Sequence, residues 1–598
     1  MKNTYKILLA TSILLLGSCE KFLDRGPLTT ESDETAWVTE DNFRLYANKY
    51  YPDFFGGYSS GQIPLLSNTN SDDVISLGNQ ANITRAVPNS SIWDYSNIRS
   101  INIFINRVQN ASPSVLSSEA KAHWLGIGRF FRAMEYADIA TTYGDIPYYD
   151  REILANELDE IYKPRTSRNE VTDAVYDDLV YAYENVRLND GVRTVNKFIV
   201  AGFITRIALQ EATWQKYYYK NTERARKFLD LAVEAGDFVI NSGNYGIVLD
   251  YKSLFTSDDL SKANRDVILY RAYDASLSVT HSVASNSNLV ESRAVGPTTD
   301  LLKAYICADG QPYQHSALAN ASKFDITNLI KTRDSRLEAT FYSKAEPLNK
   351  ASMIYVTKFL PRAEEKRVKV DGLAPNDAFK GANNETDYPV LRYSEVLINW
   401  IEAKAELATI GGATVTQSDI DISINKIRSR PIATEAAARG VIRTADLKLD
   451  NLPNDPTRDP LVSSLLWEIR RERRMEFTFE LSRLADLRRW SKIEYLDTES
   501  NPDLLSGGWV DFSAELAGEL KPANVGVITT IGLNGTQTIY NGSNGGSLVG
   551  FFRYATTKGR LPFLNQPNLN PYLQPVGLNQ MNDYTTKGYE LKQTEGWY

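Results

Sequence analysis

Two stretches of this 598-residue chain carry polar side chains dense enough to bind or cleave a polar ligand, residues 58–89 and residues 273–293. The candidate side chains are Tyr58, Asp72, Asp73, Asn79, Gln80, Asn82 and Arg85 in the first stretch and Tyr273, His281 and Asn286 in the second. Amides and carboxylates bond pairs of sugar hydroxyls, and tyrosine adds a flat amphipathic face. We therefore expect these loops to form a binding surface for a sugar or another polar ligand.

The same residues are poorly arranged for catalysis. A glycoside hydrolase needs two carboxylates about 5–10 Å apart across a cleft. Asp72 and Asp73 are adjacent, so their side chains would tend to diverge, and no other pair stands out. The three histidines lie outside helical reach of one another, which disfavours a zinc site or a Ser-His-Asp triad. We expect a binding protein that is not an enzyme and uses no cofactor, with a lipid-anchored glycoside hydrolase as the weaker alternative. No residues stand out as a metal site, and the binding of a structural metal ion stays open.

The charge pattern excludes one class of partner. The net charge is −8, whereas nucleic-acid binding requires clustered, uncompensated Lys and Arg. The densest charges lie at 468–489, where acids alternate with bases. This pattern predicts helices joined by ion pairs three and four residues apart, rather than an anion site. Six tryptophans fall in or beside helical segments and are expected in the core: Trp93, Trp124, Trp214, Trp400, Trp467 and Trp490.

Hydrophobic spacing predicts a mostly α-helical chain. Trp124, Ile127 and Phe131 recur three and four residues apart and share one helix face. Helices are expected at 93–110, 117–143, 167–188, 195–217, 221–241, 391–410, 418–429 and 461–491. Paired helices with short connections favour stacked, tetratricopeptide-like hairpins, although no clean 34-residue repeat is visible.

The remaining segments complete the expected organisation. Residues 19–40 are a polar tether, and 41–241 form an N-terminal helical part that contains the loop at 58–89. An irregular insertion with a few short strands covers 242–386. C-terminal helices occupy 387–491, and the Gly-, Asn-, Pro- and Tyr-rich residues 492–598 are expected to be ordered loop.

The N-terminus predicts export and lipidation. Lys2 and Lys6 precede a short apolar run, and Leu16-Gly17-Ser18-Cys19 follows it. Residues 1–18 are therefore expected to be a cleaved signal peptide, since a spanning helix needs about 20 apolar residues. The tetrapeptide looks like a bacterial lipobox, so Cys19 is expected to carry acyl chains that hold the protein at a membrane.

Five stretches together resemble the SusD/RagB family of outer-membrane lipoproteins from Bacteroidetes. They are RFFRAMEYADIATTYGDIPYYD at 129–150, the small-residue helix at 201–214, DYPVLRYSEVLINWIEAKAEL at 387–407, INKIRSR at 424–430 and LWEIRRERRMEFTFELSRLADLRRW at 466–490. Their order is that of the family, and Cys19 agrees with them. The chain departs at Leu481, where a glycine usually follows Phe-Glu, and at 572–576, which match the closing segment only loosely.

The resemblance implies a fold, a partner and a cargo. The fold would be stacked tetratricopeptide-like helix pairs with long loops forming the ligand surface, and ligand contacts would follow Ser71-Asp72-Asp73. The partner would be a SusC-like TonB-dependent transporter, over which the protein sits as a lid on the cell exterior. The cargo would be an oligosaccharide or glycan fragment. Because the first loop lacks a tryptophan, a peptide, as in RagB-like relatives, stays open as cargo, and a purely structural lipoprotein is a third possibility.

Overall fold

The computed structural model describes residues 36–59, 67–90, 93–261, 265–285 and 294–598. The expected signal peptide, Cys19 and Asn286 lie outside these ranges. Among the described helices, none combines the length and the apolar character needed to cross a bilayer.

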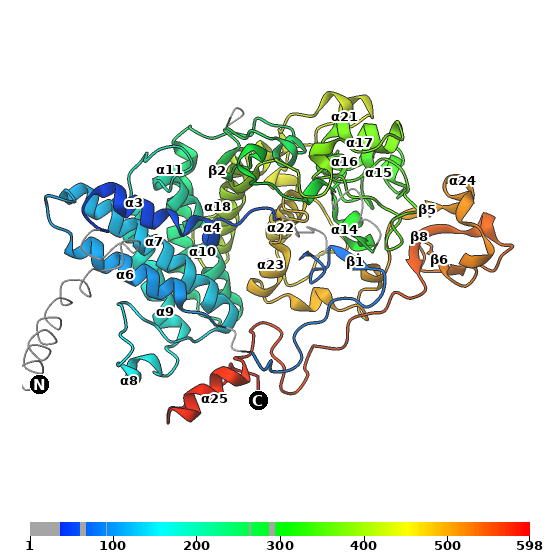
Figure 1. The fold of residues 1–598 in the computed structure, drawn as a ribbon. Helices are drawn as coiled ribbons and strands as arrows, with labels where there is room; N and C mark the ends of the chain where they lie inside the picture. The colour runs from blue at the N-terminus through cyan, green and yellow to red at the C-terminus, as the bar shows by residue number, and fades with distance from the viewer. Residues whose placement is uncertain (1–35, 60–66, 91–92, 262–264, 286–293) are drawn as a thin grey trace, which may run out of the picture.

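One half of the molecule is a stack of long helices, shown at the left of Figure 1. The helices are α6 (Ser96–Asn110), α7 (Ser118–Tyr143), α9 (Arg168–Asn185), α10 (Lys197–Tyr217) and α11 (Thr222–Asn241). Each of them packs against the next, α11 packs on α18 (Tyr393–Ala408), and α18 packs on α22 (Ser464–Glu476). The prediction of a mostly helical chain of stacked helix pairs is confirmed.

Local sequence explains where these helices begin and end. The Ser117 side chain accepts a hydrogen bond from the Ala120 amide and starts α7. Gly144, with φ +76°, ends it because glycine enters the left-handed region without steric cost. Along α7, Trp124, Ile127 and Phe131 are buried, as their spacing predicts. Five of the six tryptophans expected in the core are buried, but Trp467 is only half-buried.

The helix predicted for 461–491 is wrong in one respect, because it is two helices. α22 ends at Glu476, and α23 (Arg483–Arg489) begins after a turn. Within this turn Phe479 has φ +64° and Leu481 has φ +70°, which a continuous right-handed helix does not allow. Leu481 stands where the resemblance leads one to expect glycine, the residue best suited to that conformation.

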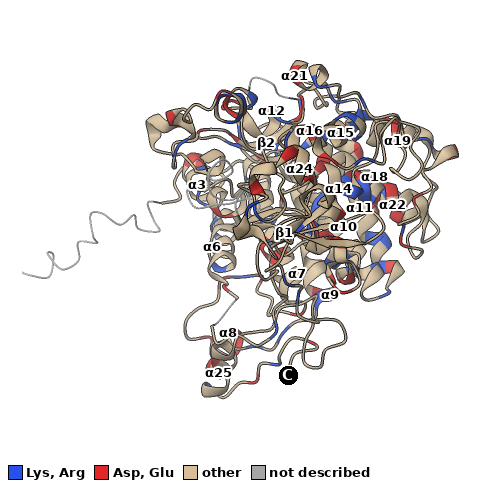
Figure 2. Ribbon diagram, turned by 90° about the vertical axis from the view of Figure 1, so that its right-hand side faces the viewer, with Lys and Arg blue, Asp and Glu red and all other residues tan. Residues whose placement is uncertain are grey.

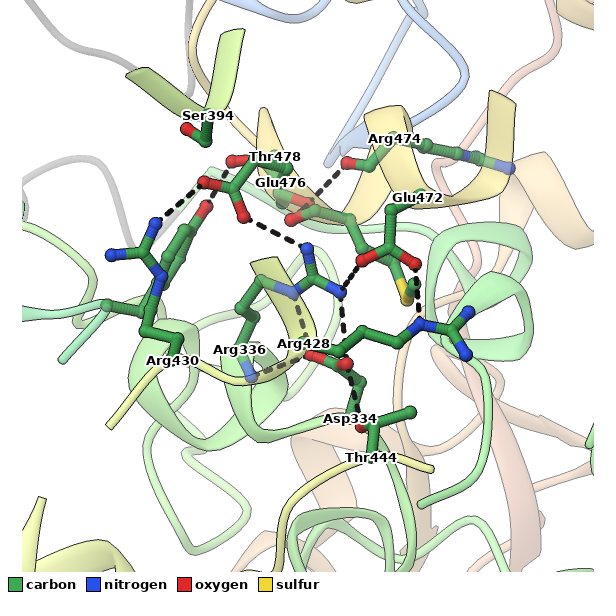
Figure 3. A network of polar contacts seen from close by, with 12 residues as sticks. Asp334, Arg336, Ser394, Arg428, Arg430, Thr444, Glu472, Arg474, Glu476 and Thr478 are labelled. Atoms are coloured by element: carbon green, nitrogen blue, oxygen red, sulfur yellow. Dashed lines mark hydrogen bonds and ion pairs between the residues drawn. The ribbon is translucent and has the colours of Figure 1, made fainter. Parts of the chain in front are cut away.

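The charges of α22 form ion pairs, as the sequence predicted, but few of them join residues of the same helix. Figure 2 shows basic and acidic residues side by side around α18 and α22. Glu472 accepts from Arg336 Nη2 at 2.5 Å and from Arg428 Nε at 3.0 Å, and both arginines lie in other elements (Figure 3). Glu468 with Arg471 and Asp486 with Arg489 do follow the i,i+3 spacing.

The insertion at 242–386 is built from short elements around a separate hydrophobic core. Its strand β2 (Val267–Arg271) pairs antiparallel with β4 (Tyr388–Arg392), which leads directly into α18. Strand β3 (Val295–Pro297) pairs antiparallel with β1 (Val74–Ser76) and is followed by helix α14 (Thr299–Ala304). The first loop and the insertion are thereby joined.

The C-terminal part contains more regular structure than the loop predicted for 492–598. A four-stranded antiparallel sheet, in the order β5-β8-β6-β7, projects at the right of Figure 1. Its strands are β5 (Trp509–Asp511), β6 (Ile528–Ile531), β7 (Gln537–Ile539) and β8 (Val549–Tyr554), and helix α25 (Leu578–Thr586) follows. The strands are three to six residues long and Gly- and Asn-rich turns separate them, so composition alone indicated loop.

The left-handed residue in the α22–α23 turn gives a first prediction. We expect Leu481→Gly to raise the free energy of unfolding by about 0.5 kcal/mol, because relief of the left-handed cost of about 1 kcal/mol or more exceeds the added entropy of the unfolded chain. Leu461→Gly, at an exposed leucine with ordinary φ, serves as the matched control and should destabilise. Chemical denaturation measures both. If Leu481→Gly lowers the free energy of unfolding as much as Leu461→Gly does, the interpretation is contradicted.

A carboxyl group of α7 predicts a pH dependence. Burial raises the pKa of Glu135 to about 7. The native state therefore favours its protonated form, and the associated stability is lost as the pH rises from about 4.5 to about 7. We expect Glu135→Gln to gain stability over the unmodified protein, by about 1 kcal/mol more at pH 8 than at pH 5, because solvent screening of this partly exposed carboxyl reduces the effect of the full pKa shift.

The control for this experiment is Glu119→Gln on the same helix. A hydrogen bond from Arg187 lowers the pKa of Glu119, so the native state favours its ionised form, opposite to Glu135. Thermal or denaturant unfolding of the three proteins between pH 5 and 8 measures the difference. If the stability difference between Glu135→Gln and the unmodified protein is the same at every pH in this range, Glu135 ionises normally.

Candidate ligand-binding surface

The first predicted loop divides at β1 into two differently placed parts. Tyr58, before β1, is buried against the insertion, where its ring centroid lies 4.8 Å from that of His281. After β1, residues 77–85 run beside the C-terminal segment 556–562, with a parallel bridge between Asn79 and Lys558. The candidate residues of this loop therefore do not all face one surface.

Asp72 and Asp73 are buried, and each forms an ion pair with an arginine. Arg483 donates Nε and Nη2 to the two Asp72 oxygens at 2.8 and 2.7 Å, and Arg474 Nε lies 2.8 Å from Asp73 Oδ1. Burial opposes ionisation of Asp72, but Arg474 and Arg483 hold its pKa well below the ordinary value. Burial raises the pKa of Asp73 despite Arg474. These carboxylates fasten the loop to α22 and α23.

Three predicted residues of the first loop are exposed, Asn79, Asn82 and Arg85. Asn82 Oδ1 accepts from the Leu561 amide at 2.8 Å, and Arg85 donates to the Pro562 carbonyl. Within the described chain, the Asn79 side chain makes no hydrogen bond. Gln80, in contrast, is buried and closes its own turn, because its Oε1 accepts from the Ser76 amide at 2.9 Å.

The described residues of the second loop form an aromatic cluster. Tyr273 and His281 are buried, and the Tyr273 hydroxyl donates to the Tyr58 carbonyl at 2.6 Å. His281 Nδ1 accepts from the Val283 amide at 3.3 Å, and Nε2 lies 2.8 Å from the Thr386 carbonyl. Burial lowers the pKa of His281 to about 4, so the ring is neutral at physiological pH. These side chains pack the insertion, and Asn286 lies outside the described residues.

Sequence reasoning missed the residue that shapes the exposed part of the first loop. Arg560 is buried, and it donates from Nε to the Ala81 carbonyl at 3.0 Å and from Nη2 to the carbonyls of Thr69 and Ser71 at 3.1 and 2.9 Å. One guanidinium thus fixes three backbone positions along the loop. A separation of 479 residues between Arg560 and Ala81 leaves no local pattern by which to find it.

The chemistry available on this surface is hydrogen bonding. Asn79, Asn82, Arg85 and Lys558 present amide, guanidinium and ammonium groups on a backbone that Arg560 holds. Across the described ranges, no three His, Cys, Asp or Glu side chains come together as a metal site. The arrangement favours recognition of a hydroxyl-rich or carbonyl-rich ligand.

Comparisons with known proteins agree on one family. The model described as the SusD family matches residues 265–597. SusD-like protein P25 of Formosa agariphila is 23% identical over 510 residues, which cover 79% of this chain and 87% of the relative.

Two solved structures share the fold. A SusD-like carbohydrate binding protein from Bacteroides fragilis superposes with a TM-score of 0.61 at 19% identity, covering 92% of this chain and 98% of its own. Surface glycan-binding protein A from Bacteroides fluxus gives a TM-score of 0.52 at 15% identity, covering 94% and 100%.

The contrast between buried and exposed loop residues predicts two different mutational outcomes. We expect Asp72→Asn to lower the free energy of unfolding by about 3 kcal/mol, because it leaves Arg483 buried beside an uncharged partner. Asn79→Ala, seven residues along the same loop, should change it by less than about 0.5 kcal/mol. Denaturant unfolding at pH 7 distinguishes them, and equal small effects would mean that the Asp72 carboxylate is not fastening the loop.

Proposed function

Because the chain belongs to the SusD family, we propose that it captures an oligosaccharide or glycan fragment and passes it to a SusC-like TonB-dependent transporter, over which it sits as a lid. The protein would be anchored in the outer membrane through acylated Cys19 and would face the cell exterior. Two structural relatives are described as a carbohydrate binding protein and a glycan-binding protein, which supports this cargo.

The observation that carries the proposal is the exposed loop surface after β1. Asn79, Asn82 and Arg85 are exposed there, while Arg560 fixes the backbone that bears them. A surface whose hydrogen-bonding groups are already positioned loses little conformational entropy on binding. Such a surface suits a polar chain with many hydroxyls, and capture on it requires no bond to be broken.

The carboxylates of the first loop support hydrolysis less well than binding. Asp72 and Asp73, the acids of the first loop, are engaged by Arg483 and Arg474, so neither is free to transfer a proton to a glycosidic oxygen. We propose that the protein binds its cargo without cleaving it. The peptide alternative makes use of the same exposed amides, and the experiment below separates the two cargoes.

We expect the purified protein to be retarded in affinity electrophoresis by at least one polysaccharide, with no shortened product released. Asn82→Ala/Arg85→Ala should weaken that retention about tenfold, or about 1.4 kcal/mol. The matched control is Asn582→Ala/Arg99→Ala, which removes an exposed asparagine and an exposed arginine elsewhere.

Other results would redirect the proposal. Retention unchanged in the loop variant would place the site away from this surface. Binding of peptides alone would assign a peptide cargo, and release of short saccharides would make the protein a hydrolase. Acyl groups on Cys19, detected by mass spectrometry of the membrane-extracted protein, would support the anchor, and an unmodified thiol would refute it.

A further inference from the structure

A second concave region lies beside helix α22, on the face opposite its buried carboxylates Glu472 and Glu476. Trp467, Arg470, Arg471 and Arg474 recur at three- and four-residue spacing, so they share one helix face and line this hollow. Helix α14 and residues 494–503 form walls, and the volume is about 710 Å³. Asp72 of the first loop belongs to the lining, but the exposed residues Asn79, Asn82 and Arg85 do not, so the hollow is distinct from the exposed loop surface.

Aromatic rings form part of the lining, and their polar atoms are already bonded. Trp467 Nε1 donates to Asp455 Oδ2 at 2.9 Å, and the Tyr495 hydroxyl donates to Asp459 Oδ2 at 2.6 Å. Both side chains are half-buried in spite of these bonds. The surface that they offer to the hollow is therefore mostly carbon, held in a fixed orientation.

Four carboxylates of the lining are paired with cations of the protein. Asp455 pairs with Arg471, and Asp459 lies 2.6 Å from Lys492 Nζ. Asp300 Oδ2 accepts from Arg474 at 2.7 Å and Oδ1 from Asn501 at 2.8 Å. Across the hollow, Lys303 Nζ lies 2.6 Å from Asp503 Oδ2. A charged ligand would have to compete with these pairs, so the lining favours a neutral one.

A neutral ligand that suits this lining has an apolar face and many hydroxyls. Pyranose rings have both, because their axial C–H groups pack on aromatic faces while their hydroxyls bond carboxylates and amides at the rim. The carboxylate oxygens retain acceptor capacity, and the exposed Gln314 supplies an amide on one wall. The volume falls within the range of pockets that enclose small ligands, about 300–1,000 Å³.

We propose that this hollow is a second saccharide-binding site, which takes a short neutral segment of a glycan chain. It is separate from the capture surface of the proposed function. Trp467 and Tyr495 supply the stacking surface, and their carboxylate partners Asp455 and Asp459 keep the rings in position. Two sites on one rigid body would let the protein hold a long glycan at two points, which raises its effective affinity.

The test is calorimetric titration of the purified protein with neutral gluco-, xylo- and manno-hexaoses and with an oligogalacturonate as the anionic probe. We expect at least one neutral hexaose to bind and the anionic probe to bind at least tenfold more weakly. Trp467→Ala and Tyr495→Ala should each raise the Kd of the neutral hexaose about tenfold. Tyr219→Ala removes an exposed tyrosine outside the hollow and should leave that Kd unchanged.

Hydrogen exchange of the unmodified protein provides a readout that does not depend on how the variants fold. The bound hexaose should slow exchange at 455–460 and 494–503 more than at 77–85. Protection confined to 77–85, or hexaose binding unaffected by both aromatic variants, would overturn the second site while leaving the proposed function intact. If no saccharide of any length binds and electrophoresis also shows no retention, both proposals fail.

Discussion

The buried ion-pair network around Glu472 and Glu476 holds the separate parts of this molecule together. Glu476 bonds Arg336 from the insertion at 2.9 Å, Arg430 from the segment after α20 (Ile424–Arg428) at 3.3 Å, and Arg392 at the end of β4. Arg336 also reaches Asp334, which in turn accepts from Thr444 (Figure 3). Burying this many charges is costly unless every one is paired, so the network favours one arrangement of these segments.

Helix α22 serves two purposes because its faces differ. Glu472 and Glu476 point into the network, while Trp467, Arg470, Arg471 and Arg474 line the hollow on the other side. Arg474 and Arg483 also hold Asp73 and Asp72, so the first loop depends on the same segment. A rigid helical stack thus positions loops that come from distant parts of the chain, which is the usual way that binding loops are supported.

This use of charge agrees with the binding role that we propose. Buried carboxylates of the first loop and of α18 are committed to arginines, as at Asp72 with Arg483 and at Glu402 with Arg489. What the surfaces leave accessible are amides, a guanidinium and half-buried aromatic rings. These groups contribute hydrogen bonds and stacking, and recognition by many weak contacts suits a flexible polymer with repeating units.

The sequence by itself determined the helices, because 3.6-residue periodicity and capping residues are local properties; α7 and α10 lie within two residues of the predicted bounds. The alternation of acids and bases at 468–489 also predicted ion pairs, although most of those in α22 join it to other elements. Tertiary structure decided which polar loop residues are exposed. Asp72 and Arg483 are 411 residues apart, and Gln80 and His281 are buried through backbone contacts that residue type does not encode.

Trp467, assigned to the core by its helical spacing, lines a hollow because α14 and 494–503 stop short of covering it. Long-range packing sets burial, and burial separates a structural side chain from one that can bind a ligand.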